Sequence, residues 1–98
     1  MNVTLNRDGN ALFVTISGRV NTATAPELEA TLVPALDGVV DLTIDMAEVL
    51  YISSAGLRVI LTAQKIMARQ GTLTVRNLRP EVYEVFDMTG FAEFINIE

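Results

Sequence analysis

Two adjacent serines, Ser53 and Ser54, have the setting in this sequence that best suits chemistry at a hydroxyl group. They follow the apolar run 50–52 and precede two small residues, Ala55 and Gly56. The segment lies where a strand is expected to give way to a helix, at the edge where open α/β sheets place their binding sites.

Small residues in the first turn of such a helix would leave backbone N–H groups accessible. An anion attached to Ser54 would therefore meet the positive end of the helix dipole. A serine at this position is also a preferred helix N-cap, worth about 1 kcal/mol. The residues alone leave both interpretations open.

Catalysis has little support in these residues. The chain has no histidine and no cysteine, so a serine nucleophile would have to find its base in a lysine or a carboxylate. The single lysine, Lys65, lies about three helical turns from Ser54. Asp45 and Glu48 are lone acids at a strand end, and no glycine-rich loop with a lysine is present to hold a phosphate. We therefore expect neither an enzyme nor a metal site.

The charges are divided unevenly along the chain, whose net charge is −5 over 98 residues. No Asp or Glu occurs in residues 49–80, which hold five of the seven basic residues: Arg58, Lys65, Arg69, Arg76 and Arg79. Three of them, Arg58, Lys65 and Arg69, fall on one side of the expected helix and are called here the basic stripe. The stripe is either a solvated helix face or a docking surface for an acidic partner or a nucleotide. The acidic balance argues against nucleic-acid binding.

We expect no secretory signal, because residues 1–4 do not form a basic segment followed by an apolar run. No apolar stretch approaches the length of about 18 residues that a membrane span needs. We expect a soluble, cytoplasmic protein with no direct membrane insertion.

The first elements are predicted from turn and capping residues. Residues 3–6 and 11–17 are apolar, β-branched segments around Asp8-Gly9, which predicts a hairpin, and Gly18 is expected to end its second strand. Thr24 with Glu27 three residues later has the spacing of a capping box, so a helix should start there. Pro34 predicts a kink in this helix or its early end near residues 31–33.

Two alternating segments, 40–45 and 72–76, read as half-exposed strands on either side of a helix over residues 55–70, which Gly71 should end. A third helix over 80–88 and a short edge strand within 91–97 complete the pattern. Because the strands alternate rather than run continuously apolar, helices should cover mainly one sheet face. We predict one domain, residues 1–98, with a two-layer α/β sandwich and a mixed four- to five-stranded sheet.

Four segments together resemble the STAS domain, a family shared by sulfate transporter tails and anti-sigma factor antagonists. The segment 52–57, Ile-Ser-Ser-Ala-Gly-Leu, preceded by the strand 40–45, is similar to the family signature. Residues 18–28 resemble its turn from strand to first helix, and 89–91 resemble its C-terminal stretch. The order and spacing of these segments cover nearly the whole chain.

The antagonist branch of this family implies a partner-switching mechanism. The unmodified protein would bind an anti-sigma factor that is also a serine kinase, and phosphorylation of Ser54 would release it; Ser53 is the second choice of acceptor. A metal-dependent serine phosphatase would reset the switch. The resemblance places the partner-binding residues at Asn21, Thr22, Ser53, Ser54, Ala55, Gly56 and Arg58. Family members commonly have Asp at the places of Ser53 and Asn21, so this chain departs from the pattern twice.

Two other functions stay open at this point. The chain could be a STAS scaffold that is not phosphorylated and that regulates a transporter or another protein complex. It could also bind a nucleotide weakly through the basic stripe, although no cofactor is expected.

Overall fold

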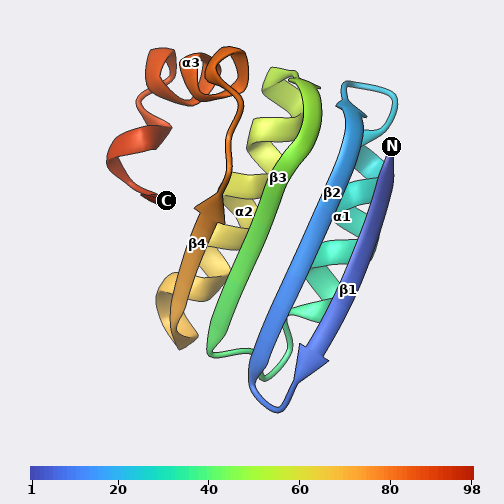
Figure 1. Cartoon of the computed structure of the whole chain (residues 1–98). Coiled ribbons are helices and arrows are strands. Elements are labelled where there is room, and N and C mark those ends of the chain that lie inside the picture. The colour runs from blue at the N-terminus through green and yellow to red at the C-terminus, as the bar shows by residue number, and fades with distance from the viewer.

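The five strands of the sheet lie side by side in the order of the sequence, β1 to β5, in a computed structural model that describes residues 1–98. The strands are β1 (Asn2–Asp8), β2 (Ala11–Val20), β3 (Asp41–Ile52), β4 (Thr72–Arg76) and β5 (Asn96–Ile97). The helices are α1 (Ala25–Ala35), α2 (Ser54–Gln70), α3 (Pro80–Met88) and the short 3₁₀ helix η1 (Phe91–Glu93). β1 pairs antiparallel with β2, whereas β2 with β3 and β3 with β4 pair in parallel (Figure 1). β5 also pairs in parallel with β4. The predicted mixed sheet is confirmed.

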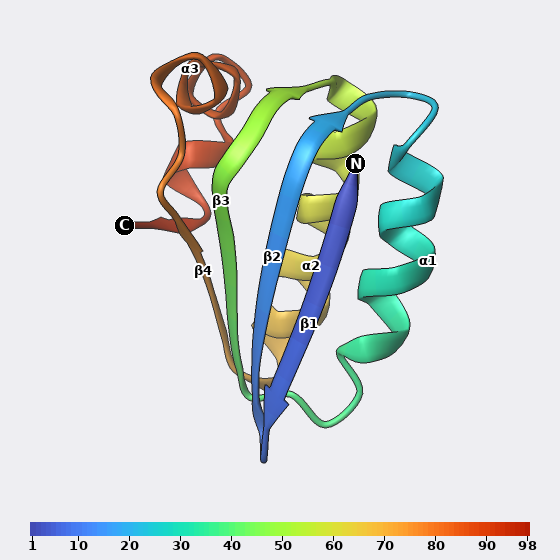
Figure 2. The ribbon, with the colours of Figure 1, turned by 45° about the vertical axis from the view of Figure 1, so that its right-hand side comes forward.

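Figure 2 shows α1 and α2 on the same face of the sheet, with α3 beyond the end of β4. The pleat explains this arrangement, because Leu12, Val14 and Ile16 of β2 are buried while Phe13 points to the other face and is 37% exposed. The core has 24 buried apolar residues and no buried polar or charged side chain. The predicted two-layer sandwich, with helices mainly on one face, is therefore confirmed.

Gly18 does not end β2, which continues to Val20. Gly18 has a φ of 91°, and the pairing register with β3 shifts immediately after it. A Cβ at this position would lie 3.2 Å from the Cα of Met1. The glycine therefore lies opposite an irregularity in β3, inside the strand pairing, and does not terminate β2.

The predicted end of the first helix near residues 31–33 was wrong, since α1 runs through Pro34 to Ala35. Pro34 stands in the last turn, so the one hydrogen bond that its missing N–H removes lies at the end of the helix, and only Ala35 follows it in α1. The carbonyl that loses its partner belongs to Ala30, which is exposed to solvent.

β3 is twice as long as the predicted segment 40–45 and ends at Ile52. Its register against β2 shifts twice, with one extra residue of β3 each time, between Asp45 and Glu48 and again between Val49 and Tyr51. These irregularities interrupt the strict alternation of buried and exposed residues along β3, so the buried residues Met46, Val49 and Ile52 are spaced by three. The longer strand carries Ser53 to the carboxyl edge of the sheet.

Candidate functional site

The start of α2 is fixed by Ser53, which is the N-cap and has an extended backbone. Its hydroxyl accepts a hydrogen bond from the backbone N–H of Gly56 at 3.2 Å. Its own N–H donates to the carbonyl of Val20 at 2.8 Å. These two bonds join the first turn of α2 to the end of β2, so the helix begins at a defined point beside the β2–α1 turn.

Gly56 allows α2 to lie directly against the sheet. A Cβ built on it would be 2.7 Å from Val20 Cγ1 and 2.8 Å from Ile52 Cγ1, closer than carbon atoms pack. Gly56 is buried, so its part in the site is to set the position of the first turn rather than to present a side chain.

Ser54 is the first residue of α2 and is exposed. Its hydroxyl makes no hydrogen bond within the protein, whereas that of its half-buried neighbour Ser53 is engaged as the helix cap. The N–H groups of Ser54 and Ala55 belong to the first turn, where no intrahelical acceptor exists. An anion carried by Ser54 would therefore lie near unpaired donors and the positive helix end.

The β2–α1 turn beside it is held by Asn21. The Asn21 side-chain oxygen accepts from the N–H groups of Ala23 and Thr24, both at 3.0 Å. The predicted capping box is absent, because the Thr24 hydroxyl donates to the carbonyl of Arg19 at 3.0 Å and accepts from the N–H of Asn21 at 2.9 Å. Thr24 occupies the N-cap position without a side-chain cap bond. The hydrogen bonds of the polar turn 19–24 hold the start of α1 in place of the predicted capping box.

Two small hollows flank the start of α2, and Arg58 lines both. The first, about 200 Å³, is bounded by α2 and the turn after α3; its lining residues are Ser54, Leu57, Arg58, Leu61, Thr89 and Phe91. The second, about 240 Å³, lies between α1 and α2; its lining residues are Thr22, Ala25, Pro26, Glu29, Ala55, Arg58 and Val59. The two hollows put Ser54 and Arg58 in a recessed surface that continues to the β2–α1 turn.

The predicted site residues are thus gathered at one end of the molecule. Thr22, Ser54, Ala55 and Arg58 line the hollows, Asn21 holds the adjoining turn, and Gly56 lies beneath them. The segment around Thr89 and Phe91 was not predicted to belong to the site. Its contact with the helix start joins residues more than 30 positions apart, which local sequence patterns cannot reveal.

The three residues of the basic stripe are all exposed on α2. None of them forms an ion pair, since the one ion pair in the structure joins Arg76 and Glu98 at 3.3 Å. The stripe begins at Arg58, inside the recessed surface, and continues along α2 away from Ser54.

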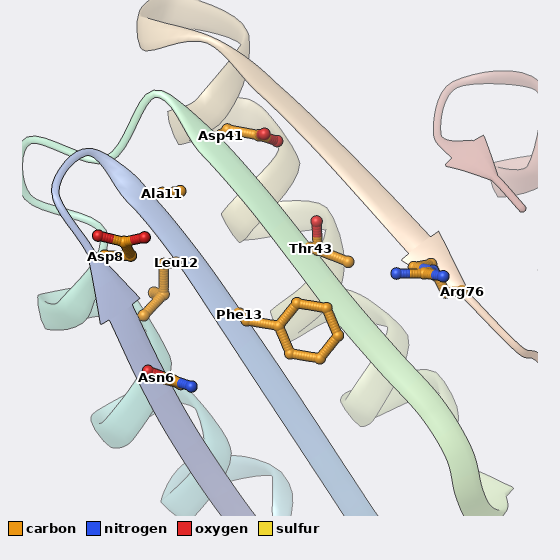
Figure 3. A pocket seen from close by; sticks show the side chains of 8 residues that line it. All are labelled: Asn6, Asp8, Ala11, Leu12, Phe13, Asp41, Thr43 and Arg76. Atoms are coloured by element: carbon orange, nitrogen blue, oxygen red, sulfur yellow. The ribbon is translucent and has the colours of Figure 1, made fainter.

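A larger hollow of about 400 Å³ lies on the sheet face that α1 and α2 leave open. Figure 3 shows the Phe13 ring extending toward β3, with Asp8 beside the β1–β2 turn and Asp41 at the start of β3. It includes none of the predicted site residues, and its one basic group, Arg76, is paired with Glu98. No group of three or more acidic side chains in the structure could hold a metal ion.

Comparison with known proteins shows the family to which the chain belongs. The profile described as "Mlab, STAS domain" matches residues 3–96. The anti-sigma-B factor antagonist of Bacillus subtilis is 34% identical over 98 residues, which cover 99% of this chain and 90% of that protein. BtrV of Bordetella bronchiseptica, provisionally named an anti-sigma factor antagonist, is 40% identical over 93 residues, which cover 93% of this chain and 80% of that protein.

Solved structures agree on the fold. An anti-sigma factor antagonist from Mycobacterium paratuberculosis superposes with a TM-score of 0.89 at 21% identity, covering 98% of this chain and 83% of the other. The phosphorylated form of SpoIIAA from Bacillus superposes with a TM-score of 0.76 at 15% identity, covering 99% of this chain and 91% of the other. Identities this low establish the shared fold alone. None of the helices here is long and apolar enough to cross a membrane.

Proposed function

Because the chain belongs to the STAS domain family, we propose that it is an anti-sigma factor antagonist controlled by phosphorylation of Ser54. In its unmodified form it binds an anti-sigma factor that is also a serine kinase. Transfer of the γ-phosphoryl group of ATP to the Ser54 hydroxyl forms a phosphoserine and ADP, and the antagonist is released. The proposal is supported by the names of relatives that align with nearly the whole chain.

One observation carries the choice of acceptor: Ser54 is exposed and its hydroxyl is free, whereas the Ser53 hydroxyl accepts from Gly56 N–H. A kinase must bring the acceptor oxygen in line with the γ-phosphate, so an accessible hydroxyl without a competing bond is favoured. Phosphate on Ser53 would in addition replace the hydroxyl that caps α2.

The charge of the phosphoryl group explains how one modification could control binding. It adds about −1.5 to −2 charges at neutral pH. Inside a docked interface this charge must be desolvated or paired, and a mismatch of about 3 kcal/mol weakens binding more than a hundredfold. In the free protein the same charge lies in water at a helix N-terminus, where it is tolerated. Binding would therefore change while the fold does not.

A metal-dependent serine phosphatase resets the antagonist by hydrolysing the exposed phosphoserine. Its metal ions belong to the phosphatase, so the antagonist itself needs none. We assign no cofactor to this chain.

The test is phosphorylation by the anti-sigma factor kinases of the source genome, each purified and incubated with the chain and ATP. Mass spectrometry of the natural chain should locate phosphate at Ser54. Ser54→Ala should abolish the modification, whereas Ser53→Ala should retain it. Modification of Ser53 in the natural chain would overturn the choice of acceptor.

Binding supplies the second half of the test. Ser54→Asp should weaken the complex with the kinase at least tenfold. Asn6→Asp is the matched control, because it adds the same charge at an exposed position on β1, away from α2 and the recessed surface. Equal affinity of the Ser54→Asp and natural chains would exclude the switch and would favour a scaffold that is not regulated by phosphate.

A further inference from the structure

We infer that the outward face of α2 is part of the docking surface for the anti-sigma factor, and that the segment it receives is acidic and carries one large apolar side chain. The inference rests on the proposed function. It adds the chemistry of the partner and the residues that recognise it, which are the basic stripe and the hollow beside Ser54.

The first argument is the charge pattern of α2. Solvated surface helices ordinarily mix charges of both signs, and pairs four residues apart stabilise them. α2 has three exposed basic residues and no acidic residue. Glu29 of α1 lines a hollow together with Arg58, but no ion pair joins them. All three positive charges of the stripe therefore remain available to carboxylates of another protein.

The second argument is continuity with the recessed surface. Ser54, Arg58, Leu61 and Lys65 follow one another by four, three and four residues, so they form one row along the outward side of α2. A partner that touches Ser54 and follows this row reaches Lys65 after about 16 Å and Arg69 after about 22 Å. The stripe is then an extension of the proposed interface, not a separate site.

The third argument is the size and lining of the hollow beside Ser54. Its lining includes Leu57, Leu61 and Phe91, with Arg58 and Ser54 beside them. At about 200 Å³ it is smaller than the range of about 300–1,000 Å³ typical of small-molecule sites. The hollow suits a single side chain better than a nucleotide. Phe94 in the segment after η1 is 68% exposed and is tied to α2 through its carbonyl, which accepts from the Gln64 amide at 3.2 Å.

The test measures association and dissociation rates of the natural chain and its variants with the purified anti-sigma factor kinase that phosphorylates it. Lys65→Gln/Arg69→Gln should lower the association rate about threefold to tenfold in low salt and leave the dissociation rate nearly unchanged. The difference should vanish near 1 M salt, where charges are screened within about 3 Å. Leu61→Gln should instead raise the dissociation rate about tenfold.

Thr4→Glu/Asn6→Asp is the matched control, because it changes the net charge by the same two units at exposed positions on β1. It should leave the association rate near that of the natural chain. If it slows association as much as Lys65→Gln/Arg69→Gln, net charge rather than the stripe is responsible and the inference is wrong. Thermal unfolding of each variant verifies that it is folded.

Three further results would overturn the inference. The first is an unchanged association rate for Lys65→Gln/Arg69→Gln while the natural chain binds and is phosphorylated; the proposed function would survive this result. The second is calorimetric binding of ATP or GTP that is lost in Lys65→Gln/Arg69→Gln, while the affinity of this variant for the kinase is unchanged. The third is a kinase that never binds the natural chain, which removes the proposed function as well.

Discussion

The Ser53 hydroxyl accepts a hydrogen bond from the backbone N–H of Gly56 at 3.2 Å, and this bond gives two adjacent serines different roles. Ser53 holds the start of α2 in place, and Ser54, the next residue, presents a free hydroxyl to solvent. The scaffold of the site and its reactive group are thus separate residues.

This separation predicts different effects on stability. Ser53→Ala should lower the free energy of unfolding by about 1 kcal/mol, because the cap of α2 is lost. Ser54→Ala should change it by less than about 0.5 kcal/mol, since no hydrogen bond is removed. Urea denaturation of both variants measures the difference, and a larger loss for Ser54→Ala than for Ser53→Ala would contradict the assignment.

Two glycines should resist substitution by alanine. Gly56→Ala places a Cβ against Val20 and Ile52 and should cost about 1–3 kcal/mol. Gly71→Ala should cost more, because its Cβ would collide with the backbone carbonyl of Val40, which cannot rotate away. Gly9→Asn is the control, as nothing lies within 4 Å and asparagine accepts its φ of 62°. Urea denaturation should show the largest loss for Gly71→Ala, a smaller one for Gly56→Ala and the smallest for Gly9→Asn.

Asn21 should matter to stability through its side-chain oxygen. Asn21→Ala removes the acceptor shared by the N–H groups of Ala23 and Thr24 and should cost about 1–2 kcal/mol. Asn21→Asp keeps an oxygen at this position, so it should retain most of the stability of the natural chain. Denaturation midpoints of the two variants test this, and equal losses would show that the bonds to Asn21 Oδ1 contribute nothing.

The positive charge of Arg58, one helical turn away, should lower the second pKa of a phosphoserine at position 54. The guanidinium and the helix N-terminus both favour the dianion, so Arg58→Gln should raise the second pKa of the phosphoserine, ordinarily about 6, by roughly 0.2–0.4 units. Phosphorus NMR titration of chains carrying installed phosphoserine measures this pKa without any partner. Lys65→Gln, two further turns along α2, is the control and should leave the pKa unchanged.

The sequence alone predicted the elements whose residues act locally. The turn at Asp8-Gly9, the alternation in β4 and the end of α2 at Gly71 were all correct, because turn chemistry and periodicity are properties of neighbouring residues. Where local signals competed with packing, prediction failed. Thr24 has the spacing of a capping box, but its hydroxyl bonds to Arg19 and Asn21 instead.

The paired serines followed by Ala55 and Gly56 are likewise a local pattern, and neighbouring residues suffice to predict that α2 begins there. Only the tertiary structure decided which hydroxyl is free and which residues surround it. Ser53 is joined to Val20, and the hollow beside Ser54 is completed by Thr89 and Phe91 from the far end of the chain. These contacts depend on how β2, α2 and α3 pack, and packing is a property of the whole chain that no window of neighbouring residues contains.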